Sequence, residues 1–130
     1  MKTLLTTFTL ILCTSLAHAQ SDTPMDMKTV DQKEFKTFLG LYVISDQSGK
    51  KKCRVRLKPD ETIGGMAIDI NKKCAKTFPV MGEVTSWRLN EGWTIVLADA
   101  TRKSLIRFYT PDAEYISDKE IDGIFTIVKK

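Results

Sequence analysis

The stretch Lys52-Cys53-Arg54-Val55-Arg56-Leu57 decides the fold, because charged and apolar side chains alternate along it without a break. A period of two residues places successive side chains on opposite faces of an extended chain. Cys53, Val55 and Leu57 would then face a core, while the three cations would face water. The stretch therefore predicts a half-buried β-strand.

The same period, or a short apolar run, recurs along the chain at close spacing. Further strands are predicted at Gly40 to Ser45, Met66 to Ile70, Thr85 to Leu89, Trp93 to Ala98, Lys103 to Tyr109, Ala113 to Ser117 and Gly123 to Val128. Between them we expect turns, including one at Lys58-Pro59-Asp60-Glu61 and a bend at Gly64-Gly65. Short strands at this spacing are typical of a β-sandwich or an up-and-down β-barrel. About eight strands suffice to close a small barrel that side chains fill.

A short helix is predicted ahead of the strands. Asp31-Gln32-Lys33-Glu34 resembles a capping box, and apolar residues follow at helical spacing as far as Gly40. We expect the helix from about Gln32 to Leu39. Residues 20–30 are polar, contain a proline and lack a sustained period, so they are expected to form an extended arm with no core to join.

The first nineteen residues have the composition of a secretory leader. Lys2 supplies a positive start, Leu4 through Leu16 supply a short apolar run, and Ala17-His18-Ala19 is a small-x-small cleavage site before Gln20. The apolar run is too short to span a bilayer and stay there. Residues 1–19 are therefore expected to be a signal peptide, and the mature chain an exported, soluble protein without membrane insertion.

Cleavage would remove residues that most enzyme sites need. His18 is the only histidine, and without it triads, Cys/His pairs and most zinc sites are excluded. Cys13 is lost too, and the remaining pair, Cys53 and Cys74, favours one disulfide in an oxidising compartment over a metal site or a nucleophile. We therefore expect no catalytic residues, no metal site of its own and no cofactor. Of the 20 basic residues only Lys2 lies in the leader, and the remaining 19 against 16 acidic residues do not indicate nucleic-acid binding.

Three local patterns resemble one known family, the periplasmic inhibitors of alkaline proteinase, a serralysin-type secreted zinc metalloprotease. The stretch Phe38-Leu39-Gly40-Leu41-Tyr42 resembles the family's Leu-Ala-Gly-x-Trp, with tyrosine in place of tryptophan. Cys53-Arg54-Val55-Arg56-Leu57 is similar to its Cys-x-apolar-x-Leu strand. Cys74, followed by Trp87-Arg88-Leu89-Asn90-Glu91-Gly92-Trp93, is similar to its second cysteine and its Trp-Arg-x-x-x-Gly segment. The resemblance covers roughly residues 38 to 97.

The resemblance implies an eight-stranded antiparallel up-and-down β-barrel with a short N-terminal helix and one disulfide, resident in the periplasm. We assume that the chain is a monomer. It further implies a non-enzymatic inhibitor, in which residues 32–130 form the barrel domain and residues 20–31 form an N-terminal trunk. The leading end of the trunk would bind in the active-site cleft of a serralysin-type protease, with its free amine near the catalytic zinc. By position, the protease-binding residues would be Gln20, Ser21, Asp22, Thr23, Pro24 and Met25.

The identity of the first residue matters for this mechanism. An N-terminal Gln20 can cyclise to pyroglutamate and lose the amine that would bind zinc, whereas trimming to Ser21 would expose a new amine. The trunk is also longer than is usual in the family, since eleven residues precede the helix cap and can span about 35 Å when extended.

Two other functions fit a small exported barrel. One is a lipocalin-like carrier that holds an apolar ligand in its interior, and the other is an inhibitor of a different hydrolase, such as lysozyme or a cysteine protease, that acts through a loop. A carrier needs a cavity, whereas an inhibitor can have a filled core. Large side chains favour filling: Trp93, Leu97, Phe108, Phe125 and Ile127. Trp87 and Trp93 are expected in the core or at a barrel end, and Phe78-Pro79-Val80-Met81-Gly82 is expected either to cover the barrel or to contact a partner.

Overall fold

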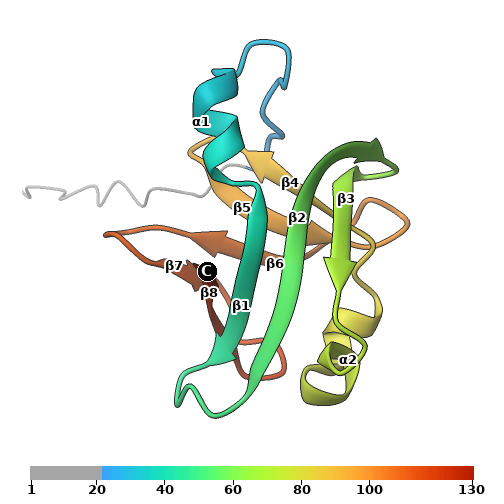
Figure 1. Cartoon of the computed structure of the whole chain (residues 1–130), viewed down its shortest axis with the longest axis vertical. Helices are drawn as coiled ribbons and strands as arrows, with labels where there is room; N and C mark the ends of the chain where they lie inside the picture. The colour runs from blue at the N-terminus through green and yellow to red at the C-terminus, as the bar shows by residue number, and fades with distance from the viewer. Residues whose placement is uncertain (1–21) are drawn as a thin grey trace, which may run out of the picture.

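The computed structural model describes residues 22–130, in which eight antiparallel strands in chain order form a closed barrel (Figure 1). The strands are β1 (Gly40–Asp46), β2 (Lys52–Thr62), β3 (Gly65–Ile70), β4 (Ser86–Asn90), β5 (Thr94–Ala98), β6 (Ser104–Tyr109), β7 (Tyr115–Ser117) and β8 (Ile124–Lys129). Each strand pairs with the next, and β8 closes the barrel against β1. The predicted all-β up-and-down barrel is confirmed, while the predicted signal peptide, residues 1–19, lies outside the described residues.

The interior of the barrel is filled by side chains. Cys53, Val55 and Leu57 of β2 are buried while the cations between them are exposed, as the alternation predicted. Among the residues predicted to fill the barrel, Leu97, Phe108 and Ile127 are buried, but Phe125 is 38% exposed. The register of β8 against β1 shifts beside Phe125, since Ser45 pairs with Thr126 and Asp46 with Ile124. This bulge turns Phe125 outward, so its predicted place in the interior was wrong.

The predicted turn at Lys58-Pro59-Asp60-Glu61 is also wrong, because β2 continues through it to Thr62. Leu57 pairs with Ile68 and Glu61 pairs with Met66, so three residues of β2 face one residue of β3 in the interval. This bulge accommodates Pro59, which has no backbone N–H to donate to a ladder. The chain reverses instead at the Gly64-Gly65 bend, where both glycines have positive φ.

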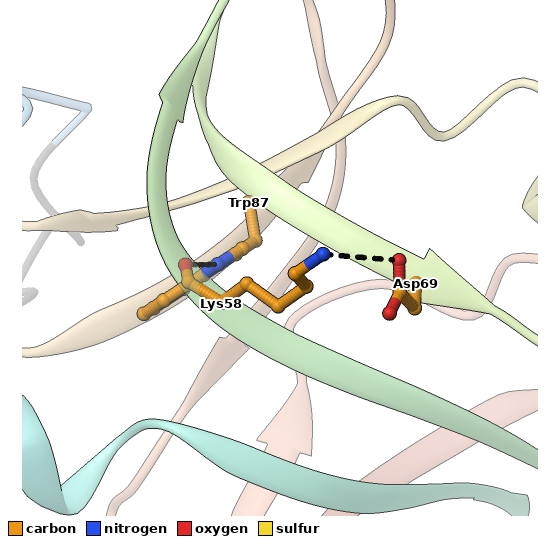
Figure 2. A network of polar contacts seen from close by, with 3 residues as sticks. All are labelled: Lys58, Asp69 and Trp87. Carbon is orange, nitrogen blue, oxygen red and sulfur yellow. Dashed lines mark hydrogen bonds and ion pairs between the residues drawn. The ribbon is translucent and has the colours of Figure 1, made fainter.

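The β2 bulge also supplies a partner for the most bulky core residue. The indole Nε1–H of Trp87 on β4 donates to the backbone oxygen of Lys58 at 2.9 Å (Figure 2). The Lys58 side chain in turn lies 3.7 Å from a carboxylate oxygen of Asp69 on β3. Trp87 is fully buried, so its polar N–H needs a partner inside the protein. The hydrogen bond and the ion pair together join β2, β3 and β4.

Short helices lie at the two ends of the barrel (Figure 1). At one end is α1 (Gln32–Thr37), whose cap Asp31 accepts from the backbone N–H of Lys33 at 2.8 Å, as the capping pattern predicted. The helix ends two residues before the predicted Leu39, since Phe38 is already its C-cap. At the other end are α2 (Cys74–Thr77) and the 3₁₀ turn η1 (Pro79–Gly82).

The apolar segment around η1 covers its end of the barrel. Phe78 and Met81 are buried in the hydrophobic core, with exposed fractions of 0% and 2%. Two roles were predicted for this segment, covering the barrel or contacting a partner, and its burial supports the first. The predicted disulfide joins Cys53 at the start of β2 to Cys74 at the start of α2, and thus holds the cover to the barrel wall.

The pairing between β3 and β4 is short. Met66 and Trp87 are the one register pair between β3 and β4. Gly65 lies so close to β4 that a Cβ atom there would be 2.3 Å from the Trp87 backbone oxygen. The strands therefore approach closely at this point, and β4 continues beyond it without β3 as a partner.

Replacing both cysteines, Cys53→Ala with Cys74→Ala, should lower the free energy of unfolding by about 3 kcal/mol in the chain-entropy treatment of a loop of this length. The two cysteines are separated by 21 residues. Urea denaturation of the native and substituted proteins measures the difference. A loss below about 1 kcal/mol would show that the bridge contributes little.

Gly65→Ala should destabilise the barrel more than Gly49→Ala. Both glycines have positive φ, so both substitutions introduce backbone strain, but nothing lies within 4 Å of a Cβ at Gly49. At Gly65 a steric clash is added, which we expect to cost a further 1–3 kcal/mol or so. Thermal and urea unfolding of the two variants measure this, and equal losses would contradict the close approach of β3 and β4.

Candidate functional site

The edge of β4 that β3 leaves unpaired is occupied by the N-terminal segment. Met25 N–H donates to the Leu89 oxygen at 2.9 Å, and Glu91 N–H donates to the Thr23 oxygen at 2.8 Å. Pro24 lies opposite Asn90 in an antiparallel bridge. The two hydrogen bonds flank this pair, so Pro24 sits at a position where its missing N–H breaks no bond. We call Asp22–Met25 the docked segment.

The docked segment is also held by an ion pair. The Asp22 carboxylate forms an ion pair with the Arg107 guanidinium on β6. Arg107 and Arg88 of β4 both pair in register with Val96 of β5, so they lie in one row across three strands. Burial lowers the pKa of Arg88, the neighbouring Arg107 cation lowers it further, and Asp22 opposes both effects. One carboxylate therefore lies beside two cations.

Arg88 joins the segments that surround the Met66–Trp87 pair of β3 and β4. Its guanidinium donates to the backbone oxygens of Gly64 and Arg102, each at 3.3 Å, and to the Ser104 hydroxyl at 2.6 Å. These groups belong to the β2–β3 bend, to the loop before β6 and to β6 itself. A planar guanidinium can donate several hydrogen bonds in different directions, so one side chain can bind acceptors from these three segments. The surface that carries the docked segment is thereby fixed.

Aromatic packing fixes the helix that follows the segment. Phe38 stacks on Trp93 with ring centroids 5.3 Å apart, and it meets Tyr115 edge-on at 6.3 Å. The Tyr115 hydroxyl donates to the Trp93 backbone oxygen at 2.8 Å. Burial raises the pKa of Tyr115, and the nearby Glu34 carboxylate adds to the effect, so the phenol stays neutral and remains a donor. α1 is therefore anchored to the β4–β5 turn beside the docked segment.

The chain between the docked segment and α1 joins the core, contrary to the predicted arm. Met25, Met27 and Val30 are partly buried and pack against the core cluster. A turn at Asp26, whose backbone oxygen accepts from the N–H groups of Thr29 and Val30, brings the chain back toward the helix. The prediction was wrong because these apolar side chains, though few, meet the open barrel end.

A cleft of about 730 Å³ lies between this chain and the tip of the β2–β3 hairpin. Its apolar lining includes Met25, Met27, Phe35 and Met66, and Arg88 also contributes to its wall. The cleft therefore lies at the α1 end of the barrel and borders the docked segment. The large side chains of the interior, by contrast, leave the barrel axis filled.

The structure places four of the six predicted protease-binding residues. Asp22, Thr23 and Pro24 are exposed, and Met25 is half-buried. Gln20 and Ser21 lie outside the described residues. Trp87 is buried in the core, and Trp93 packs at the barrel end, where both were expected.

Residues 22–130 contain no group of three or more His, Cys, Asp and Glu side chains arranged to hold a metal ion. Within the same range, no helix has the length and apolar composition needed to cross a membrane.

Sequence reasoning missed the residues that hold the segment. Arg88 and Arg107 are the one charged residue in β4 and in β6, and a single cation within each of two strands could have indicated a shared anion partner. The alternation of Met25 and Met27 with charged residues could have indicated a docked strand. The pairing with β4 itself carries no local signal.

Fold and site together define a small, disulfide-bonded β-barrel with an N-terminal segment paired on its surface. The family model described as protease inhibitor Inh matches residues 32–127, and the protein therefore belongs to this family, the periplasmic alkaline proteinase inhibitors. The match begins after the trunk. No curated protein matches the chain. Membership supports a role as a protease inhibitor, with a protease as its partner.

Proposed function

We propose that the protein is a periplasmic inhibitor of a serralysin-type zinc metalloprotease, and that residues Gln20–Met25 enter the active-site cleft of that protease. Membership of the inhibitor family is the observation that carries the proposal. The target class follows from the resemblance of the Phe38–Tyr42, Cys53–Leu57 and Trp87–Trp93 motifs. Export by cleavage before Gln20 would place the protein in the periplasm.

The geometry of the N-terminal segment supports the trunk as the inhibitory element. It is a narrow, extended strand that stands outside the closed barrel and is exposed along Asp22, Thr23 and Pro24. An extended backbone is the form in which peptides occupy clefts by strand pairing. The barrel, the disulfide and the aromatic anchor of α1 hold the base of the trunk in place, which lowers the entropy lost on binding.

Inhibition would follow from the chemistry of the target's zinc. Catalytic zinc sites keep one coordination position open for the water that attacks the substrate. An unprotonated α-amine is a nitrogen ligand that can fill this position and displace the water. The amine would come from Gln20, or from Ser21 after trimming, and cyclised Gln20 would not bind.

The structure gives less support to the competing functions. A carrier of an apolar ligand needs an internal cavity, and the barrel axis is filled by large side chains such as Trp87, Phe108 and Leu97. An inhibitor of another hydrolase acting through a loop stays compatible with the family, and the deletion below distinguishes it.

Titration of a serralysin-type protease with the mature protein should give a stoichiometric loss of activity. A variant that begins at Met25 should inhibit at least about a hundredfold more weakly, equivalent to some 2.7 kcal/mol of binding. This variant keeps the packing of Met25 against the core, so its melting temperature should fall only slightly.

Two outcomes would contradict the proposal in different ways. If the shortened variant inhibits as strongly as the full mature chain, the trunk is not the inhibitory element and a loop must act. If the full mature chain, with its amino terminus verified by mass spectrometry, does not inhibit at all, the target class is wrong.

A further inference from the structure

The docked segment consists of residues that are also proposed to enter the protease, and on the barrel one edge of its backbone is already paired. On the barrel, Met25 N–H and the Thr23 oxygen are already bonded to Leu89 and Glu91 of the β4 edge. In a protease cleft, the backbone of an inserted strand is held by hydrogen bonds to the cleft walls. One edge of the segment cannot serve both partners at once.

The reach of the chain leads to the same conclusion. The ion pair with Arg107 holds Asp22 on the barrel surface. Ahead of Asp22 the expected mature chain has only Gln20 and Ser21, which span about 7 Å when extended. Released as far as Met25, the six residues 20–25 span about 20 Å. Release therefore lets the amine reach about 13 Å further from the barrel surface.

The ion pair that holds the leading end of the segment is open to solvent, since the side chains of Arg107 and Asp22 are 28% and 69% exposed. The backbone contacts that hold the segment include the hydrogen bonds from Met25 N–H to the Leu89 oxygen and from Glu91 N–H to the Thr23 oxygen. Exposed ion pairs contribute little to stability and are screened by salt. Of the docked residues, Met25 alone is half-buried, and Met27 and Val30, which follow it and pack against the core, can stay in place as the hinge.

We propose that the β4 edge and Arg107 form an intramolecular docking site that holds the trunk in a non-inhibiting position, and that the trunk must detach before it enters the protease. The inference rests on the proposed function. Docking lowers the apparent affinity for the protease, because that affinity is the affinity of the detached form multiplied by the fraction of molecules in which the trunk is detached. The protease therefore competes with the protein's own β4 edge for the segment.

A reversible cross-link tests the inference. Pro24 and Asn90 form a non-hydrogen-bonded antiparallel pair, the closer of the two pair types, so Pro24→Cys with Asn90→Cys should form a disulfide between trunk and β4. The oxidised double variant should inhibit a serralysin-type protease at least tenfold more weakly than the same protein after mild reduction. The two single variants control for each substitution, and native protein given the same reductant controls for the Cys53–Cys74 bridge.

A second pair of variants tests docking without altering the trunk. Arg107→Ala removes the partner of Asp22 and should speed association with the protease about two- to fivefold, the range expected from loss of an exposed ion pair. Arg54→Ala is the matched control, since it removes the same charge from an exposed position on β2. It should leave the association rate unchanged.

The outcomes separate the inference from the proposed function. Equal inhibition by the oxidised and reduced double variant would overturn the inference and leave the proposed function standing. Slower association of Arg107→Ala than of Arg54→Ala would also overturn it, because the docked position would then be the one that binds. Failure of the native protein itself to inhibit would refute the proposed function and, with it, this inference.

Discussion

The short contact between β3 and β4 is the constraint on which the rest of the structure depends, because β3 begins at Gly65 and pairs in register with β4 only through Met66 and Trp87. Gly65 permits the close approach, because a Cβ there would overlap the Trp87 backbone oxygen, and the β2 bulge offers the Lys58 oxygen to the buried indole. Beyond this point β4 has an edge that β3 does not cover. An exposed edge invites another strand, and in this protein the N-terminal segment takes the place.

This uncovered part of the β4 edge explains why a closed barrel carries an extended segment on its surface that does not belong to its wall. The wall is stabilised by filled packing, by the Cys53–Cys74 bridge at one end and by the Phe38–Trp93 stack at the other. The segment, by contrast, lies outside the wall, and its leading end is held by an ion pair that is open to solvent. Stability is thus concentrated in the barrel, and the segment can change partners at low free-energy cost.

Patterns confined to one element were predicted well from the sequence. The alternation around Val55 gave the inward face of β2, the cysteine count gave the bridge, and Asp31 marked the start of α1. The errors concern features set by residues far away in the chain. A turn was predicted at Pro59 because the bulge that accommodates this proline depends on the pairing of β2 with β3. Phe125 was predicted to be internal because the bulge beside it depends on the pairing of β8 with β1. The trunk was predicted to be unattached because the edge that pairs with it lies in β4. Of the candidate site, the sequence indicated the segment but not Arg107 or the edge that holds it.

We propose that the N-terminal residues leave their own barrel in order to block another molecule's zinc. A crystal structure of the mature protein bound to a serralysin-type protease is the decisive experiment. We expect residues 20–25 to be extended in the protease cleft, with the terminal amine at the zinc, and the β4 edge from Leu89 to Glu91 to be no longer paired with Thr23 and Met25. A complex in which the segment is still paired with β4, and a barrel loop occupies the cleft instead, would contradict this proposal.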